Sequence, residues 1–429
     1  MLWTPLNVMQ GIYIKYYGFS IGLLAAILLA SRLYDAVADI AIGSLSDWSK
    51  AKTGRRKPLF ALGAALFAVC ALFVYIPPKS VGPFYLTFWL FAFFTAYAMT
   101  TIPHLAWGAE LAASSVERTR ILSMRCAASY SGLCLFYAIP LLPLFASSAI
   151  TPRAIRYAVL LAVAILVPAL LACLKFVPEA RTLKIAERRQ SLFSRRAIRD
   201  LGGNRPFRAL MSAYLICGLA LGIWYGMIFI FVDVYLHRGA WFAPLYLLAF
   251  GAGILAALGW HKIAARFGKK TAWTAGMLLT LATVGATGFL TPRNASLWSL
   301  GSILVLNTMG FVSFELLPAS IVGDVADYTE LKMNRNQTAT LYALYMFATK
   351  VVVALGAALG LALSAALGFD PHLIEQGPTG VNALAVVMSW LPGLLLVAAI
   401  MLIPCIPMNE RRHAIVRRRL DQLCARQVR

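Results

Sequence analysis

Apolar residues recur along this chain in runs that are separated by short polar segments. Two such runs extend from Phe60 to Pro77 and from Val387 to Pro404. A helix rises about 1.5 Å per residue, so roughly 20 apolar residues cross the ~30 Å hydrocarbon core of a bilayer. Transmembrane β-strands are shorter and alternate in polarity, unlike these runs. The pattern therefore predicts an all-α membrane protein.

The runs predict about twelve transmembrane helices of the length that a bilayer requires. They lie near residues 2–17, 20–46, 58–77, 83–112, 119–146, 154–177, 207–236, 241–265, 271–290, 296–327, 337–368 and 380–407. A long polar stretch interrupts them halfway along the chain. The expected organisation is an N-terminal six-helix half at 1–177, a basic cytoplasmic linker at 178–206, a C-terminal six-helix half at 207–407 and a basic cytoplasmic tail at 408–429.

Two short motifs recur in both halves at a constant offset. Gly268 follows Gly54, and Asp324 follows Glu110, by the same 214 positions. Basic residues come directly after each of these glycines. Parallel repeats of this kind build transporters whose substrate site lies at the membrane midplane between the halves. The alternative is chance, combined with the general use of glycine and basic residues in cytoplasmic loops.

Composition and charge placement exclude a soluble protein and argue against a nucleic-acid partner. Only 13% of the residues are charged, whereas soluble domains carry roughly 25%. The net charge of +22 is concentrated in the loop at 50–57, the linker and the tail. This asymmetry follows the positive-inside rule and places these segments and both termini in the cytoplasm. The tail arginines have no interleaved aromatic residues to stack on bases, so we expect them to contact anionic lipid.

The chain shows no motif of an enzyme or of a metal site. Its seven cysteines are scattered, without metal-ligand spacing or a redox pair. It contains no His-rich set, nucleophile motif or phosphate-binding loop. We therefore expect a protein that is not an enzyme and has no cofactor, apart from a coupling H⁺ or Na⁺. A sensor would need a folded output domain, for which the tail is too short.

Three ionisable residues lie within the apolar segment at 20–46. Arg32, Asp35 and Asp39 are three and four residues apart, so they share one face of a helix. A charge at the bilayer centre costs at least ~2.5 kcal/mol, which makes each of them a functional candidate. Two carboxylates one turn apart repel each other, so the pair either shares a proton or captures a monovalent cation. The alternative is a packing element in which Arg32 neutralises Asp35.

Lys350 is a further charge within the predicted membrane region, on a different predicted helix. Long apolar runs flank it on both sides, so its ammonium group has no interface within reach. It needs an acidic partner, and Asp35 and Asp39 in the other half are the candidates. Such a contact would hold the halves together and respond to cation occupancy.

Four further polar residues lie in predicted helices, and three of them have two interpretations. Glu315 and Asp233 are candidates for the substrate cavity, although a His-Arg pair follows Asp233 and favours the outer membrane interface for it. His104 is either a hydrogen-bonded packing residue or a proton relay. Arg125 either reaches the cytoplasmic interface or clamps the substrate.

A polar loop motif begins at the end of the segment at 20–46. Gly43 and Asp47 precede the sequence Gly54-Arg55-Arg56. Glycine permits a tight turn, and Asp47 can pair with basic groups or cap the end of a neighbouring helix. We interpret this motif as a cytoplasmic conformational latch and not as a ligand site.

Several of these motifs carry a resemblance that spans nearly the whole chain. They are Arg32-Leu33-Tyr34-Asp35-Ala36-Val37-Ala38-Asp39, Gly54-Arg55-Arg56-Lys57-Pro58, Ala109-Glu110-Leu111, Asp324-Val325-Ala326-Asp327-Tyr328 and Thr349-Lys350. In these motifs the chain resembles the glycoside–pentoside–hexuronide:cation symporters, the group of the melibiose carrier within the major facilitator superfamily. The resemblance implies the major facilitator fold.

The resemblance also implies roles for individual residues. Cation binding and coupling would fall to Asp35, Asp39, Lys350 and Arg32. The substrate-binding candidates are Tyr97, Thr101, Arg125 and Glu315, of which the first three lie where the family lines its sugar site. The candidates for a cytoplasmic gate are Asp47, Arg55, Arg56, Asp324 and Asp327.

The chain departs from the family pattern at four positions and at its start. Thr101 stands where the melibiose carrier has a sugar-binding aspartate, and Ala98 replaces a cation-site threonine. Ile40 replaces a proline, and Glu315 a tryptophan. These differences favour proton coupling and a solute other than a galactoside. Residues 1–17 are too few for a full span, so our hypothesis is that the first helix is truncated.

The sequence thus predicts a secondary active transporter. It would couple H⁺ or Na⁺ to the symport of a sugar or glycoside-like solute by alternating access. The alternative is a proton-coupled exporter or carrier of an amphiphilic or lipid-like solute. We expect a monomer in the plasma (inner) membrane, with the small-molecule solute and the bilayer as its partners.

Overall fold

The computed structural model describes residue 13 and the ranges 17–78, 81–112, 114–143, 151–179, 203–333, 337–369 and 376–428. Within these ranges every regular element is helical and no strand occurs. The predicted all-α fold is thus confirmed. Most of the first predicted helix and most of the predicted linker at 178–206 lie outside the described residues, and the boundaries of the two halves stay a prediction.

A helix is present at each predicted position from 20–46 onward. In the first part of the chain these are α2 (Ile21–Thr53), α3 (Lys57–Tyr75), α4 (Pro83–Leu111), α5 (Ser115–Ala138) and α6 (Pro152–Phe176). In the second part they are α8 (Arg205–Ile230), α9 (Gly239–Phe267), α10 (Lys269–Thr287), α11 (Leu297–Met333), α12 (Thr338–Ala366), α13 (Pro378–Ala385) and α14 (Leu391–Leu402). Short π-helical turns extend α8 through Phe231–Tyr235 and join α13 to α14 through Val386–Trp390.

Two helices differ from the sequence-based prediction. Helix α2 continues past residue 46 and stops where Gly54 adopts a φ of 71° and donates its N–H to the Lys50 carbonyl, a left-handed cap suited to glycine. The tail, where no helix is predicted, forms α15 (Glu410–Val428). Its first turn is capped by Asn409, whose Oδ1 accepts the Arg412 N–H at 2.9 Å. A polar helix of this kind lacks the apolar run by which the other helices are recognised.

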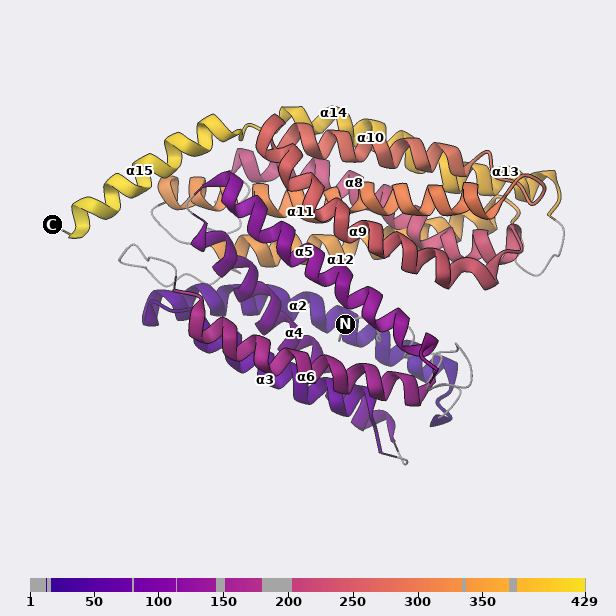
Figure 1. Cartoon of the computed structure of the whole chain (residues 1–429), viewed down its shortest axis with the longest axis horizontal. Helices are drawn as coiled ribbons and strands as arrows, with labels where there is room; N and C mark the ends of the chain where they lie inside the picture. The colour runs from indigo at the N-terminus through magenta and orange to yellow at the C-terminus, as the bar shows by residue number, and fades with distance from the viewer. Residues whose placement is uncertain are drawn as a thin grey trace.

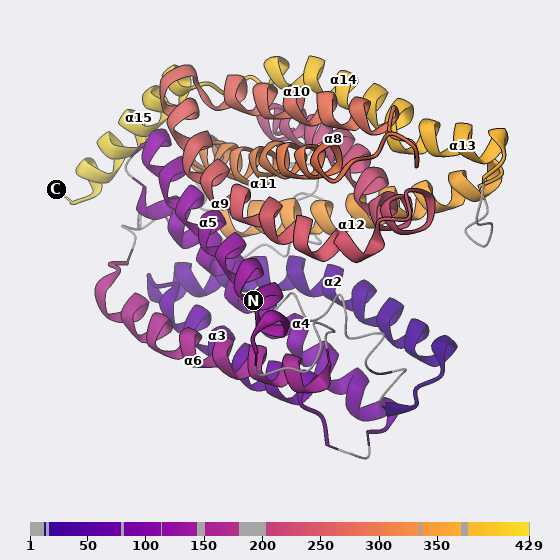
Figure 2. The same ribbon diagram turned by 45° about the vertical axis from the view of Figure 1, so that its right-hand side comes forward.

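The helices form two groups that lie side by side (Figure 1). One consists of the helices of the first part of the chain, α2–α6, and the other contains α8–α12 and α14. Helix α5 of the first group reaches over to the second group, where it packs on α9, in both views (Figure 2). Helix α2 packs on α12. Two helix pairs, α2–α12 and α5–α9, therefore join the groups.

Glycines permit the closest helix contacts. A Cβ added at Gly222 of α8 would lie 2.6 Å from the carbonyl oxygen of Val353 of α12, so these two backbones touch. A Cβ at Gly43 of α2 would lie 2.5 Å from the Ala343 Cβ of α12. Small residues at helix contacts are typical of membrane bundles, where packing drives association. Gly43 therefore sets the approach of the two groups.

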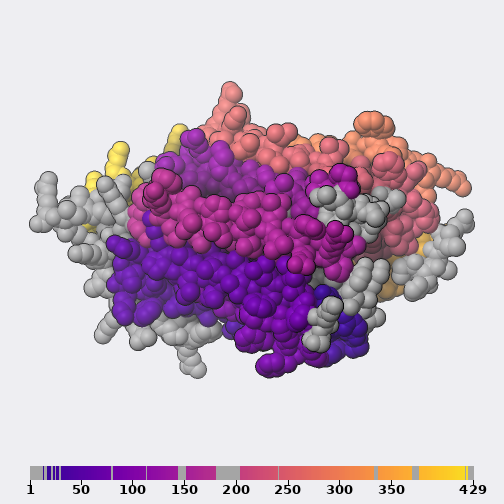
Figure 3. Space-filling view, turned by 60° about the horizontal axis from the view of Figure 1, so that its bottom comes forward, coloured from indigo at the N-terminus to yellow at the C-terminus, as the bar shows by residue number. Residues whose placement is uncertain are grey.

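The outer surface is suited to lipid. Among the described residues, eight helices are long and apolar enough to cross a membrane. Figure 3 shows the outer side of the first group, where α6 lies beside α3. Large apolar side chains of these two helices are exposed, including Leu171 of α6 at 62% and Leu62 of α3 at 53%. Contiguous exposed apolar surface of this extent indicates a membrane-embedded protein.

Candidate functional site

The α2–α12 contact holds three charges, of which the two carboxylates are buried and the ammonium is partly exposed. The Lys350 Nζ of α12 lies 2.8 Å from Asp35 Oδ1 and 2.7 Å from Asp39 Oδ2 of α2. Asp35 is 0% and Asp39 1% exposed. The spacing of four residues on one helix brings both carboxylates to the same ammonium group. Of the charges that the sequence places within the membrane, the structure thus brings Asp35, Asp39 and Lys350 together.

Asp35, Asp39 and Lys350 together carry one net negative charge when all three are ionised, and Arg32, three residues before Asp35, is a further cation on the same helix face. The Asp35 Oδ2 atom is buried and accepts no hydrogen bond from any residue that the structure describes. A buried carboxylate oxygen without a partner is costly, and a proton or a small monovalent cation would relieve it. The cluster therefore has open carboxylate lone pairs for one such cation.

Aromatic residues of α4 surround this cluster. The Lys350 Nζ lies 5.8 Å from the ring centre of Tyr97, and the Arg32 guanidinium carbon lies 5.3 Å from that of Phe94. Both distances are within the range of cation–π attraction. Thr101, one turn beyond Tyr97, is buried. Of the predicted substrate residues, Tyr97 thus lies next to the charged cluster.

A second polar group lies where α5 meets α11. The Tyr130 hydroxyl of α5 donates a hydrogen bond to Glu315 Oε2 of α11 at 3.0 Å, and Cys126 Sγ lies 3.9 Å from the same atom. Arg125 of α5 lines a cavity of about 240 Å³ between α4 and α5, together with His104. The His104 ring also stacks on Phe60, which suits its packing interpretation.

Asp233, the other substrate-cavity candidate, lies in the π-helical turn after α8. Its side chain is exposed. This position agrees with the interface interpretation of Asp233.

The two groups are also joined at one end of the bundle, which we call the basic end. It carries the loop Gly54–Arg56 and helix α15. Asp47 of α2 accepts hydrogen bonds there from the Ala339 N–H at 3.0 Å and from the N–H and hydroxyl of Thr340 at 2.8 and 2.7 Å. An anion at a helix N-terminus is favourable because it satisfies free N–H groups and complements the helix dipole. Asp47 thus caps α12 from the other group.

The same carboxylate belongs to an ion-pair cluster. Arg56 Nη2 lies 2.8 Å from Asp47 Oδ1 and 2.8 Å from Glu110 Oε1, and Lys50 Nζ lies 2.9 Å from Glu110. Burial acts to lower the pKa of Arg56, but Glu110 and Asp47 outweigh it and raise this pKa above its ordinary value. Arg56 is therefore charged. Arg55, the other predicted gate arginine, has an exposed side chain.

A second cluster joins α5 to α11. Arg118 of α5 donates to Asp324 Oδ1 and, at 2.7 Å, to Asp327 Oδ2 of α11. Lys269 Nζ lies 2.6 Å from Asp324 Oδ2, and His413 Nε2 of α15 lies 2.8 Å from Asp327 Oδ2. The tail helix is thus anchored to the contact between the two groups.

The two clusters relate to each other as the sequence motifs do. Glu110 pairs with Arg56, two positions after Gly54, and Asp324 pairs with Lys269, one position after Gly268. Each repeat thus folds its acidic residue onto the basic residues that follow its glycine. This geometry supports an internal repeat over chance similarity.

Several buried charges at the basic end have no place among the predicted gate residues. Arg118, Lys50, Lys269 and His413 are at most 5% exposed and all contact carboxylates. In the sequence they stand near other basic residues whose side chains are exposed. Neither residue type nor position in the chain therefore shows which of these basic residues are buried. The spacing of Asp324 and Asp327 is the one available signal, since two carboxylates three residues apart fit one arginine fork.

Comparison with known proteins agrees with this architecture. The model of the family "MFS/sugar transport protein" matches residues 2–410. The uncharacterized symporter YjmB of Bacillus subtilis is 23% identical over 95% of this chain and 90% of its own. The putative glycoside/cation symporter YagG of Escherichia coli is 23% identical over 81% of this chain and 75% of its own.

Solved structures share the fold. The Escherichia coli fucose:proton symporter FucP superposes with a TM-score of 0.58 at 17% identity, over 95% of this chain and 96% of its own. The human organic anion transporter MFSD10 superposes with a TM-score of 0.61 at 16% identity, over 93% of this chain and 90% of its own. At these identities the likeness concerns the fold. The predicted family resemblance is confirmed by the match over nearly the whole chain: the protein belongs to the MFS/sugar transport protein family of membrane transporters and is not an enzyme.

Proposed function

We propose that the protein is a secondary active transporter that couples H⁺ or Na⁺ to the symport of a sugar or glycoside-like solute. The observation that carries this proposal is the Lys350 ammonium group between Asp35 and Asp39 at the contact of α2 and α12. Burying ionisable groups inside a membrane protein costs free energy, so such a cluster is a functional site by default. The relatives named as symporters support the same reaction.

The charge balance of the cluster provides the coupling mechanism. Two carboxylates and one ammonium leave one negative charge that a proton or Na⁺ would neutralise. The bound cation would compete with Lys350 for the carboxylate oxygens and weaken the tie between α2 and α12. Because these helices belong to different groups, cation occupancy would change the relative stability of the two access states. Solute and cation would then strengthen each other's binding by linkage.

We assign the basic end to the cytoplasm from the placement of lysine and arginine along the chain. Both termini then lie in the cytoplasm, and the protein resides in the plasma (inner) membrane. The capping of α12 by Asp47 and the pairing of Arg118 with Asp324 would hold the cytoplasmic gate closed. Rupture of these contacts would open the solute path towards the cytoplasm. We propose a monomer with no cofactor besides the coupling ion.

The solute would bind between the groups, towards Tyr97, Thr101, Arg125 and Glu315. Tyrosine faces pack on sugar rings, while carboxylate and guanidinium groups bond hydroxyls. A row of rings near Glu315 favours a solute that also has an apolar part: Tyr137 and Tyr246 both pack on Phe250, at 5.7 and 5.4 Å between ring centres. This row also supports the alternative, an amphiphilic or lipid-like solute.

Uptake into proteoliposomes tests the proposed function. A panel of labelled sugars, glycosides and amphiphiles would be offered under an inward proton gradient, an inward Na⁺ gradient or neither. We expect concentrative uptake of a glycoside under one of the gradients. If the uptake of every transported solute is unaffected by both the proton gradient and the Na⁺ gradient, cation coupling is refuted.

A further inference from the structure

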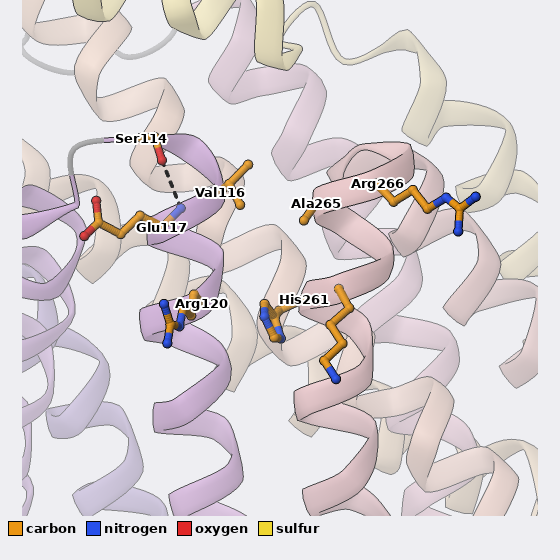
Figure 4. Close-up of a pocket in the computed structure, with 8 residues that line it drawn as sticks. Ser114, Val116, Glu117, Arg120, His261, Ala265 and Arg266 are labelled. Atoms are coloured by element: carbon orange, nitrogen blue, oxygen red, sulfur yellow. Dashed lines mark hydrogen bonds between the residues drawn. The ribbon is translucent and has the colours of Figure 1, made fainter.

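A pocket of about 640 Å³ lies at the basic end between α5 and α9 (Figure 4). This is within the ~300–1,000 Å³ range of small-molecule sites. Four of its lining residues are basic: Arg120 on α5, and His261, Lys262 and Arg266 on α9. The two helices belong to different groups of the bundle, so the pocket spans the contact between them. None of these residues belongs to the cation cluster or to the predicted gate.

The side chains give the pocket a positive character. Figure 4 shows Arg120 and His261 facing each other across the space between the helices. The His261 Nδ1 donates to the Leu258 carbonyl at 2.7 Å, so its Nε2 is the atom left for a ligand. Glu117 is the acidic residue of the lining, and its carboxylate points away from α9 in Figure 4. An anion in the pocket would thus meet basic groups from both helices.

Each of the two helices continues from this pocket as an exposed apolar stripe. On α5, Met124 follows Arg120 by four residues and is 49% exposed. On α9, Leu255 precedes Lys262 by seven residues and is 70% exposed, and Leu248 precedes it by fourteen at 61%. Spacings of four and seven place these residues on the same helix face as the basic residues. The surface is therefore charged at the basic end and apolar along the membrane.

We propose that this pocket binds the headgroup of an anionic phospholipid of the cytoplasmic leaflet. Its phosphate would lie between Arg120 and the basic residues of α9, and its acyl chains would follow Met124 and Leu255. A soluble phosphate would use the charges but not the apolar stripes, which is why the geometry favours a lipid. A ligand that bridges α5 and α9 binds best when the basic end is closed. It therefore stabilises that state, by the same free energy with which closure strengthens lipid binding.

Lipid titration of the purified full chain tests the binding. Phosphatidylglycerol and phosphatidylcholine of equal chain length would be titrated in detergent, and bound lipid would be counted by native mass spectrometry. We expect phosphatidylglycerol to bind more tightly. Each basic residue near a membrane surface contributes about fivefold in affinity for anionic lipid. The double variant Arg120→Gln with Lys262→Gln should therefore weaken phosphatidylglycerol binding roughly 25-fold.

Controls separate this proposal from general charge effects. Arg208→Gln removes an exposed basic residue of α8 outside the pocket and should leave the affinity unchanged. Equal affinity for the two lipids, or an unaltered affinity in the double variant, would overturn the proposal. Displacement of the lipid by millimolar inorganic phosphate would assign the pocket to a soluble anion and also overturn it. An unchanged thermal unfolding temperature of the variants excludes misfolding as the cause.

A second readout tests the bridging role. Spin labels at Lys52 of α2 and Lys332 of α11, which are both exposed at the basic end, report the separation of the two groups. We expect phosphatidylglycerol to enlarge the closed population of the parent protein and to have no such effect in the double variant. If phosphatidylglycerol leaves the closed population of the parent protein unchanged, the proposal that the lipid bridges α5 and α9 is contradicted.

Discussion

Asp47 of α2 holds Thr340 of α12 through a single oxygen: Oδ2 accepts the main-chain N–H at 2.8 Å and the side-chain hydroxyl at 2.7 Å. The carboxylate therefore supplies the N-terminal cap of a helix that belongs to the other group of the bundle. A helix cap is normally local, and here it forms only when the basic end is closed. The stability of the start of α12 and the closure of the bundle are thereby linked.

The substitution Asp47→Asn should favour opening of the basic end. It removes the negative charge at the start of α12 and the ion pair with Arg56. Asparagine still offers one accepting oxygen to the helix end, so the loss is that of the charge. A partly buried charge at a helix end contributes up to about 2 kcal/mol, so the ratio of closed to open molecules should fall by up to roughly thirtyfold. Distances between spin labels on Lys52 and Lys332 measure this ratio. Asp233→Asn, an exposed position, is the matched control; an equal shift in both variants would contradict the role of the cap.

Gly43→Val should prevent closure by a steric route. The added Cβ would fall 2.5 Å from the Ala343 Cβ, a distance that packed atoms do not adopt, and only 3.1 Å from the Ala339 carbonyl oxygen. We expect the variant to reach the membrane but to lose solute uptake in proteoliposomes. Gly251→Ala is the control, because an added Cβ there meets no atom within 4 Å. Normal uptake by Gly43→Val would show that α2 and α12 need not approach as described.

Arg118→Gln should destabilise the whole bundle. It leaves Asp324 and Asp327, which are 3% and 6% exposed, without the fork that pairs with both. Loss of one partner from a buried ion pair costs about 3–5 kcal/mol. The thermal unfolding temperature in detergent should fall clearly, whereas Arg208→Gln at an exposed site should leave it unchanged. A small effect of Arg118→Gln would mean that Lys269 and His413 suffice for these carboxylates.

Glu315→Gln should change solute recognition and leave the coupling ion unaffected. The amide keeps the shape of the side chain but loses the charge that accepts the Tyr130 hydroxyl at 3.0 Å. A charged hydrogen bond to a solute contributes about 1.5–3 kcal/mol, so KM should rise at least tenfold. Tyr130→Phe removes the hydroxyl that orients the carboxylate and should raise KM by less. Unaltered KM values in both variants would place the solute elsewhere.

Much of the architecture could be predicted because a bilayer imposes simple rules. Helix length follows from bilayer thickness, and charges that violate the apolar pattern stand out, as Asp35, Asp39 and Lys350 do. The basic end could be predicted less well. Arg118 and Arg120 differ by two positions in the sequence, yet one is buried in an ion-pair cluster and the other is exposed. Tertiary packing decides which side of a helix end faces the other group of helices, and the local sequence pattern does not show it.

The most direct test of the coupling mechanism is concentrative uptake by the variant Asp35→Asn. The substitution leaves Asp39 and Lys350 as a balanced pair with no negative charge for a cation to neutralise. We predict normal expression and equilibration of solute across the proteoliposome membrane, with no accumulation under either a proton or a Na⁺ gradient. Gradient-driven accumulation at the level of the parent protein would contradict the proposal that this cluster couples the cation to the solute.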